Sequence, residues 1–366
     1  MAEPLLQVED LRVHFETEDG VVKAVDGVSY TVDAGKALGI VGESGSGKSV
    51  SSMTVMGLTR ASNAHITGRI LFDGKDLLAA SDDEMRAVRG GQIAMIFQDP
   101  LSSLHPFYRV GDQLVEARRV HHDESKAQAR DRAIEMLSLV GIPDPRRRVD
   151  SYPHEFSGGM RQRVMTAMAL INDPKLLIAD EPTTALDVTV QAQILELIQK
   201  LQHELDTAVV MITHDLGVVA EVAEEIAVMY AGRIVEKGHA DTIFAEPEHP
   251  YTWGLLNSIP RLDTPRDQEL VPIPGRPPSL ITRPPGCSFA PRCPYVREAH
   301  RRVDPVLASA EGADHTVACL LPSQTRRALW SRLRAGASPE EAKEAVNIPE
   351  TLSESAPKEG EEVTSA

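Results

Sequence analysis

A glycine-rich octapeptide near the N-terminus has the composition and spacing of a phosphate-binding loop. Residues 42–49 read GESGSGKS and fit G-x-x-x-x-G-K-[ST] at every position. The loop follows an apolar run (36–42) and precedes a segment with helical spacing (49–58), so backbone N–H groups and a helix N-terminus would face an anion. We expect Lys48 to reach the β- and γ-phosphates of a nucleotide and Ser49 to ligate Mg²⁺. The residues expected to surround the phosphates are Gly42, Ser44, Gly45, Ser46, Gly47, Lys48 and Ser49.

Two adjacent acids end a second apolar strand. Residues 175–180 read KLLIAD, and Glu181 follows directly. Because neighbouring strand residues point to opposite sides, the two carboxylates can take different roles. Asp180 can hold Mg²⁺ through water, whereas Glu181 can orient and deprotonate an attacking water.

Two further polar residues follow apolar strands. His214 closes the strand of MITHD, and Gln98 follows the strand of MIFQDP. Parallel strands would bring their C-terminal ends together near the phosphate loop. His214 would then sense the γ-phosphate, and Gln98 would ligate Mg²⁺ or position water. Taken singly, each also fits a structural role, as a satisfied histidine or as the start of a turn before Pro100.

Composition favours an α/β protein that does not bind nucleic acid. The chain has 366 residues, of which 42% are hydrophobic, and this is ample for a core. Its net charge of −16 argues against a general nucleic-acid binder. Three cysteines are too few for a disulfide-stapled domain. We expect neither a signal peptide nor a membrane span, because residues 1–15 lack a basic and then apolar pattern and no apolar run reaches 18 residues.

Changes in composition divide the chain into three parts. An α/β body over 1–246 is interrupted by helical patterns from about 105 to 172. A proline-dense extension follows over 247–325 and carries the cysteines. Residues 326–366 are expected to be helical and then acidic, with disorder from Glu340 onward. An acidic partner-binding tail is the alternative for this last stretch.

The order of the motifs resembles the ATPase subunit of ABC transporters over roughly residues 5–245. The motifs are GESGSGKS, Gln98, the stretch Phe156-Ser157-Gly158-Gly159-Met160, LLIADE, Ala185-Leu186-Asp187 and His214. The resemblance implies a P-loop ABC ATPase with an antiparallel β-subdomain, a RecA-like core, an inserted helical subdomain and a proline-rich C-terminal extension. It also implies ATP and Mg²⁺ as ligands.

The same resemblance implies a head-to-tail dimer with ATP at the seam. Ser157, Gly158 and Gly159 would contact the partner's γ-phosphate, and Asp187 would lie at the seam. Phe15 matches the adenine-stacking aromatic, although it also fits an ordinary strand-end residue. The signature here reads FSGGM where the family commonly has LSGGQ. Its Ser-Gly-Gly core is intact, and with Glu181 and His214 present the site is expected to hydrolyse ATP.

Within the family, the chain resembles the dipeptide/oligopeptide importers. MIFQDPLSSLHPFYRVGDQL, PEHPYTWGLLNSIP, VPIPGRPPSL and GCSFAPRCP carry this likeness. It implies several partner proteins. They are a second ATPase subunit, expected to be a different chain, two transmembrane permease subunits and an extracytoplasmic solute-binding protein. The chain would then be peripheral, on the cytoplasmic face of the cell membrane. A nickel or other small-solute importer and a soluble, non-transport ABC ATPase are the alternatives.

The cysteines of the extension follow a spacing that suggests a metal site. The pattern is Cys287-x5-Cys293-x6-His300-x18-Cys319. The resembling segment of peptide importers usually carries four cysteines, which implies a [4Fe–4S] cluster, and here His300 occupies one position. Three cysteines and a histidine also suit zinc, and His315 is another nearby candidate ligand. The remaining alternative is that the cysteines are small buried side chains.

Overall fold

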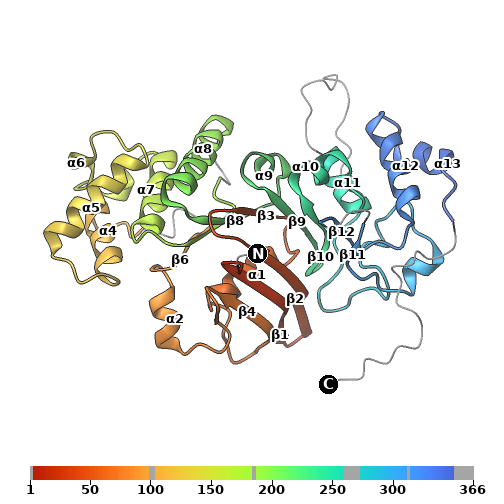
Figure 1. Cartoon of the computed structure of the whole chain (residues 1–366), viewed down its shortest axis with the longest axis horizontal. Coiled ribbons are helices and arrows are strands. Elements are labelled where there is room, and N and C mark those ends of the chain that lie inside the picture. Colours follow the sequence, from red (N-terminus) through yellow and green to blue (C-terminus); the bar gives the residue numbers. More distant parts are fainter. Residues whose placement is uncertain (1–2, 99–103, 184–186, 259–272, 311–313, 350–366) are drawn as a thin grey trace.

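A small antiparallel sheet and a large mixed sheet form the body of the molecule (Figure 1). The computed structural model describes residues 3–98, 104–183, 187–258, 273–310 and 314–349. The small sheet has the strand order β2-β1-β4-β5. Its strands are β1 Leu6–Thr17, β2 Gly20–Val32, β4 Ala64–Phe72 and β5 Lys75–Asp76. This is the antiparallel β-subdomain that the sequence predicts.

The large sheet has a parallel centre and an antiparallel edge. Its order is β11-β12-β10-β9-β3-β8-β7-β6, and the pairing is parallel from β9 through to β6. The parallel strands are β3 Ala37–Val41, β6 Ile93–Ile96, β7 Leu176–Asp180, β8 Ala208–Thr213 and β9 Glu225–Tyr230. All side chains of β3, β7 and β8 are buried, as expected where helices cover both faces of a parallel sheet.

Helices cover the sheet and form a separate lobe. The lobe contains α4 Val110–Arg119, α5 Lys126–Leu139, α6 Pro145–Arg148 and α7 Gly158–Leu170, and it matches the predicted helical insert (Figure 1). The body contains α1 Lys48–Val55, α2 Asp82–Val88, α8 Val188–Leu205 and α9 Leu216–Val222. The helical spacing of residues 49–58 predicted α1, and the helical patterns from about 105 to 172 predicted the lobe, whereas the short α2 and α9 were not foreseen.

The C-terminal extension continues the main sheet rather than forming a detached unit. Strand β10 (Arg233–His239) turns back along β9 and pairs with β12 (Thr316–Val317), which pairs in turn with β11 (Ala308–Ser309). The remaining helices are α10 Ala240–Ala245, α11 Pro250–Asn257, α12 Ser323–Arg334 and α13 Pro339–Ala345. The expectation of disorder from Glu340 is wrong for residues 340–345, because Ser338 caps α13 and Ala342 is buried. Residues 350–366, the rest of the predicted tail, lie outside the described residues.

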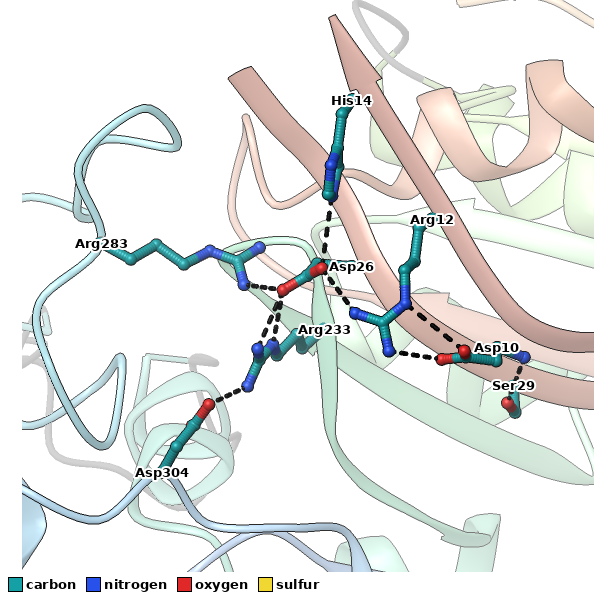
Figure 2. A network of polar contacts seen from close by, with 8 residues as sticks. All are labelled: Asp10, Arg12, His14, Asp26, Ser29, Arg233, Arg283 and Asp304. Carbon is teal, nitrogen blue, oxygen red and sulfur yellow. Dashed lines mark hydrogen bonds and ion pairs between the residues drawn. The ribbon is translucent and has the colours of Figure 1, made fainter. Parts of the chain in front are cut away.

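One buried carboxylate ties the small sheet to β10 and to the extension (Figure 2). Asp26 of β2 is only 7% exposed. Its oxygens accept hydrogen bonds from Arg12 Nη1 at 2.9 Å, Arg233 Nη2 at 2.9 Å and Arg283 Nη1 at 2.6 Å. Burial alone would raise the pKa of Asp26, but the hydrogen bond from Arg233 and the charges of Arg283 and Arg12 hold it well below its usual range.

We predict that Asp26→Asn destabilises the fold at neutral pH by about 3–5 kcal/mol, because three guanidinium groups lose their shared counter-charge. Since the pKa of Asp26 is lowered on folding, its contribution is complete above the unfolded value of about 4 and is lost as the pH falls below it. Urea unfolding at pH 7 and at pH 3 measures both effects. Asp83→Asn is the matched control, because Asp83 forms an exposed ion pair with Arg86 and should change stability by less than about 1 kcal/mol. An Asp26 variant as stable as this control would contradict the prediction.

Candidate functional site

The phosphate loop joins β3 to α1 and needs glycine at two crowded positions. Gly47 has a φ of 100°, and a Cβ there would lie 2.3 Å from the carbonyl oxygen of Ala24. A Cβ at Gly42 would lie 2.1 Å from the carbonyl oxygen of Met229. Both contacts are with backbone atoms, which cannot move aside as a flexible side chain could. Glycine therefore allows the loop to curl tightly between β2 and β9 at the start of α1.

Lys48 and Ser46 are buried in this loop with their polar groups available to an anion. Lys48 is 5% exposed, and its Nζ donates to the carbonyl oxygens of Gly42 at 2.6 Å and Glu43 at 3.0 Å. Burial lowers the pKa of Lys48, and the carboxylates of Glu181 and Asp180 oppose that shift. In the part of the chain that the structure describes, the buried Oγ of Ser46 has no hydrogen-bond partner. An arriving phosphate would supply the acceptor that this hydroxyl lacks.

Ser49 and Asp180 meet beside Lys48. The Ser49 hydroxyl donates to Oδ1 of Asp180 at 3.1 Å. Burial raises the pKa of Asp180, and the neighbouring Glu181 adds to that effect. A hydroxyl and a carboxylate oxygen are ligands that Mg²⁺ prefers, and a cation here would offset the cost of burying the charge. This donor set therefore fits a magnesium ion.

Three predicted residues converge at the ends of β6, β7 and β8. Gln98 Nε2 donates to Oε2 of Glu181 at 2.9 Å, and His214 Nδ1 lies 3.1 Å from Oε1 of the same carboxylate. Glu181 itself has a φ of +46°, a backbone conformation that residues other than glycine rarely adopt. Such backbone strain is typical of functional positions, and no sequence pattern predicted it here.

The predicted signature residues lie at the start of a helix in the other lobe. Ser157 caps α7 by accepting from the backbone N–H of Met160 at 3.3 Å, and Ser157 and Gly158 are exposed. Gly159 lies against α8, because a Cβ there would be 2.8 Å from Cγ1 of Val190. Asp187 caps α8 by accepting from the N–H of Val190 at 3.0 Å. Ala185 and Leu186 lie outside the described residues.

Phe15 lies on β1, half-buried against the apolar core between the small sheet and α1. That packing is the ordinary strand-end role left open by the sequence. The adenine-stacking role stays a prediction.

The cysteines of the extension surround one small apolar cavity. Cys287, Cys293, His300 and Cys319 line a space of about 10 Å³, room for no more than about one water molecule. Burial raises the pKa of Cys287 to about 12 and also raises the pKa values of Cys293 and Cys319, which favours thiols over metal-binding thiolates. Among the described residues, no group of three or more histidine, cysteine or acidic side chains could hold a metal ion.

The predicted iron–sulfur cluster, and zinc as its alternative, are therefore not supported. His300 Nδ1 accepts from the backbone N–H of Arg297 at 3.0 Å. His315, the other candidate, lies with its Nε2 2.8 Å from the buried carboxylate of Glu236. The geometry corresponds to the remaining alternative, small buried side chains.

Sequence reasoning missed three residues that shape the phosphate loop. Glu43 occupies a variable position of the motif, yet Arg292 pairs with its carboxylate at 2.6 Å and the Tyr251 hydroxyl accepts from its backbone N–H at 2.8 Å. Both partners belong to the extension. The only available signal was the arginine inside GCSFAPRCP, and nothing in its spacing pointed to the loop.

Comparisons with known proteins identify the family of the chain. A family model described as ABC transporter matches residues 25–184, and a second, described as the oligopeptide/dipeptide transporter C-terminal region, matches residues 235–299. The dipeptide transport ATP-binding protein DppD of Bacillus subtilis is 55% identical over 88% of this chain and 96% of its own length. The oligopeptide transport ATP-binding protein OppD of Salmonella typhimurium is 53% identical over 85% of this chain and 92% of its own.

Solved structures give the same fold. The ATP-binding cassette MJ0796, in a dimeric post-hydrolysis state bound to ADP and Pi, superposes with a TM-score of 0.58 at 26% identity, over 64% of this chain and 98% of its own. CbiO1 of Clostridium perfringens, part of the ABC transporter complex CbiONQ, superposes with a TM-score of 0.57 at 30% identity, over 67% and 92%. Within the described ranges, no helix has the length and apolar character needed to cross a membrane. The predicted fold is confirmed, and the chain belongs to the ABC transporter family as an ATP-hydrolysing subunit of the oligopeptide and dipeptide transporter branch.

Proposed function

We propose that this chain binds and hydrolyses ATP at the phosphate loop to power the import of peptides through a membrane permease. The observation that carries the proposal is the convergence of Gln98 and His214 on the Glu181 carboxylate beside Lys48. The peptide substrate is supported by DppD and OppD, whose names state dipeptide and oligopeptide transport and which align with most of this chain.

ATP binding relies on charge and on backbone N–H groups. The loop residues Gly42 to Ser49 surround the phosphates, and Lys48 exchanges its carbonyl partners for phosphate oxygens. Ser49, Asp180 and Gln98 would hold Mg²⁺, which neutralises charge that develops on the phosphate oxygens. Phe15 contributes stacking against the adenine ring.

Hydrolysis requires a base that is aimed at water. Glu181 accepts a proton from the attacking water at a carboxylate oxygen, and Gln98 and His214 hold that carboxylate from either side. The water oxygen bonds to the γ-phosphorus. The bond between the γ-phosphorus and the oxygen that bridges it to the β-phosphorus breaks, which leaves ADP and phosphate. His214 is exposed and can also contact the γ-phosphate directly.

Two ATP molecules close a head-to-tail dimer in this proposal. Ser157 and Gly158 are exposed and lie with Gly159 at a helix N-terminus, which suits an anion held by another chain. Asp187 caps the neighbouring helix next to them. The cassette MJ0796, which is dimeric and bound to ADP and Pi, supports a dimer of ATPase chains. We infer that the partner is a second, different ATPase subunit.

The chain would bind two permease subunits at the cytoplasmic face of the cell membrane, as a peripheral subunit. An extracytoplasmic solute-binding protein would deliver the peptide to the permease. Large apolar side chains are exposed where β6 leads into the helical lobe, and Phe107 is the most prominent at 81%. Phe97 and Tyr108 are also exposed there. An apolar surface of this kind is typical of a protein contact site.

The cysteines enter this proposal as packed thiols rather than metal ligands. We predict that Cys287 and Cys319 react slowly with a thiol reagent at pH 8 and rapidly in urea, because both are buried and the pKa of Cys287 is raised to about 12. Ellman titration of the anaerobically purified protein, with and without urea, measures this. Rapid native reaction, or one iron cluster or zinc ion per chain by elemental analysis, would overturn the assignment.

For the base, we predict that Glu181→Gln binds ATP normally, lowers turnover by about 100-fold or more and accumulates the ATP-bound dimer. The amide keeps the size of the side chain but cannot take a proton. ATPase assay and size-exclusion chromatography of the assembled transporter measure these effects. Glu196→Gln on the exposed face of α8 is the matched control and should leave both unchanged. Near-normal turnover in Glu181→Gln would exclude this role.

For the partners, we predict that the tagged chain co-purifies from detergent-solubilised membranes with two multi-span proteins, and that cells carrying Glu181→Gln lose uptake of labelled di- and oligopeptides. Phe107→Asp should reduce the co-purification without loss of ATP binding. Uptake of nickel instead of peptides, or recovery of the chain only with soluble complexes, would favour one of the two alternative functions.

A further inference from the structure

The C-terminal extension holds the phosphate loop at Glu43. Arg292 Nη1 donates to Oε2 of Glu43 at 2.6 Å, and Arg292 Nη2 donates to Oε1 at 3.0 Å. The backbone N–H of Glu43 donates to the hydroxyl of Tyr251 at 2.8 Å. Both the side chain and the backbone of this loop position are therefore fixed by residues that come more than 200 positions later.

Arg292 is itself held rigidly. It is only 3% exposed, and its Nε donates to the carbonyl oxygen of Pro274 at 2.8 Å. Its Nη groups also reach the carbonyl oxygen of Ile273 at 3.2 Å and the hydroxyl of Tyr230 at 3.4 Å. With the two bonds to Glu43, each of the five donors of the guanidinium has an acceptor. A fork fixed in this way sets the position of the carboxylate it binds.

Glu43 in turn contacts the lysine of the phosphate site. Its carbonyl oxygen accepts from Lys48 Nζ at 3.0 Å and from the backbone N–H of Ser46 at 3.2 Å. A shift of Glu43 would therefore move the loop around Lys48. In addition, an unpaired Glu43 carboxylate would place a negative charge beside the site of a negatively charged phosphate chain, and close charges interact strongly in a partly buried setting.

We propose that Arg292 is a positioning residue for nucleotide binding, through which the extension holds and neutralises Glu43 of the phosphate loop. The inference rests on the nucleotide site proposed above. It also gives the segment GCSFAPRCP a structural role, because the packed cysteines Cys287 and Cys293 flank the turn that presents Arg292. The backbone N–H of Arg292 closes that turn by donating to the carbonyl oxygen of Phe289 at 2.9 Å.

The test is the ATPase of the assembled transporter, measured as KM for ATP and kcat. Arg292→Gln should raise KM about tenfold, as expected for loss of a hydrogen-bonded charge pair, with a smaller change in kcat. Arg292→Lys keeps the charge without the fork and should give an intermediate KM. Adding Glu43→Gln to Arg292→Gln should restore most of the KM, because the unpaired charge is then gone.

Two arginines of the extension provide matched controls. Arg302→Gln breaks an exposed pair with Glu298 and should change neither stability nor KM. Arg326→Gln breaks a buried pair with Glu248 and should lower Tm without raising KM. If Arg292 had only a structural role, Arg292→Gln would lower Tm without raising KM, as Arg326→Gln should. Adding Glu43→Gln would then not improve the KM. An unchanged KM in a folded Arg292→Gln, or a raised KM that Glu43→Gln does not restore, would overturn the proposal.

Two further variants keep the test decisive. If Arg292→Gln does not fold, Tyr251→Phe removes only the hydroxyl that accepts from Glu43, and it should raise KM severalfold. An unchanged KM there would count against the proposal. Lys48→Met separates the two levels of inference. If Lys48→Met still binds a fluorescent ATP analogue, the nucleotide site itself is excluded. If Lys48→Met loses this binding while Arg292→Gln keeps a normal KM, only the role of Arg292 is excluded.

Discussion

The parallel pairing of β3, β7 and β8 is the constraint on which the nucleotide site depends. Parallel strands end at the same edge of a sheet, so the residues that follow them meet without any local contact in the sequence. The phosphate loop follows β3, the acid pair lies at the end of β7, and His214 follows β8. If β7 were reversed in the sheet, Glu181 would lie at the opposite edge. The chemistry is therefore a consequence of strand direction.

This part of the structure could be predicted from the sequence because buried parallel strands have continuous apolar runs. Residues 36–42 and 175–180 predicted β3 and β7 to within a residue or two. The turn at Ala231-Gly232 joins β9 to β10, and both residues have positive φ there, as a tight hairpin requires. Short helices such as α9 lack enough residues to show a period. The left-handed backbone of Glu181 leaves no trace in a sequence, because it is imposed by the surrounding fold.

The extension could not be read in the same way. Its spacing of three cysteines and a histidine indicated ligands, yet spacing does not say which way side chains point or how much room they enclose. The cavity among them is only about 10 Å³. Conversely, the contact between Arg292 and Glu43 joins residues 249 positions apart, and one of them occupies a variable position of a known motif. Pairings of this kind are set by tertiary packing and have no local pattern.

Three of the contacts between body and extension share one physical form. In each, an acid of the body meets a basic residue of the extension: Asp26 with Arg283, Glu43 with Arg292 and Glu236 with His315. In a chain with a net charge of −16, a buried or half-buried carboxylate without such a partner is costly. Removing the extension would take a basic partner from each of these acids, and Glu43 of the phosphate loop would lose Arg292. In the proposal made above, the extension is therefore part of the structure that makes the loop able to accept an anion.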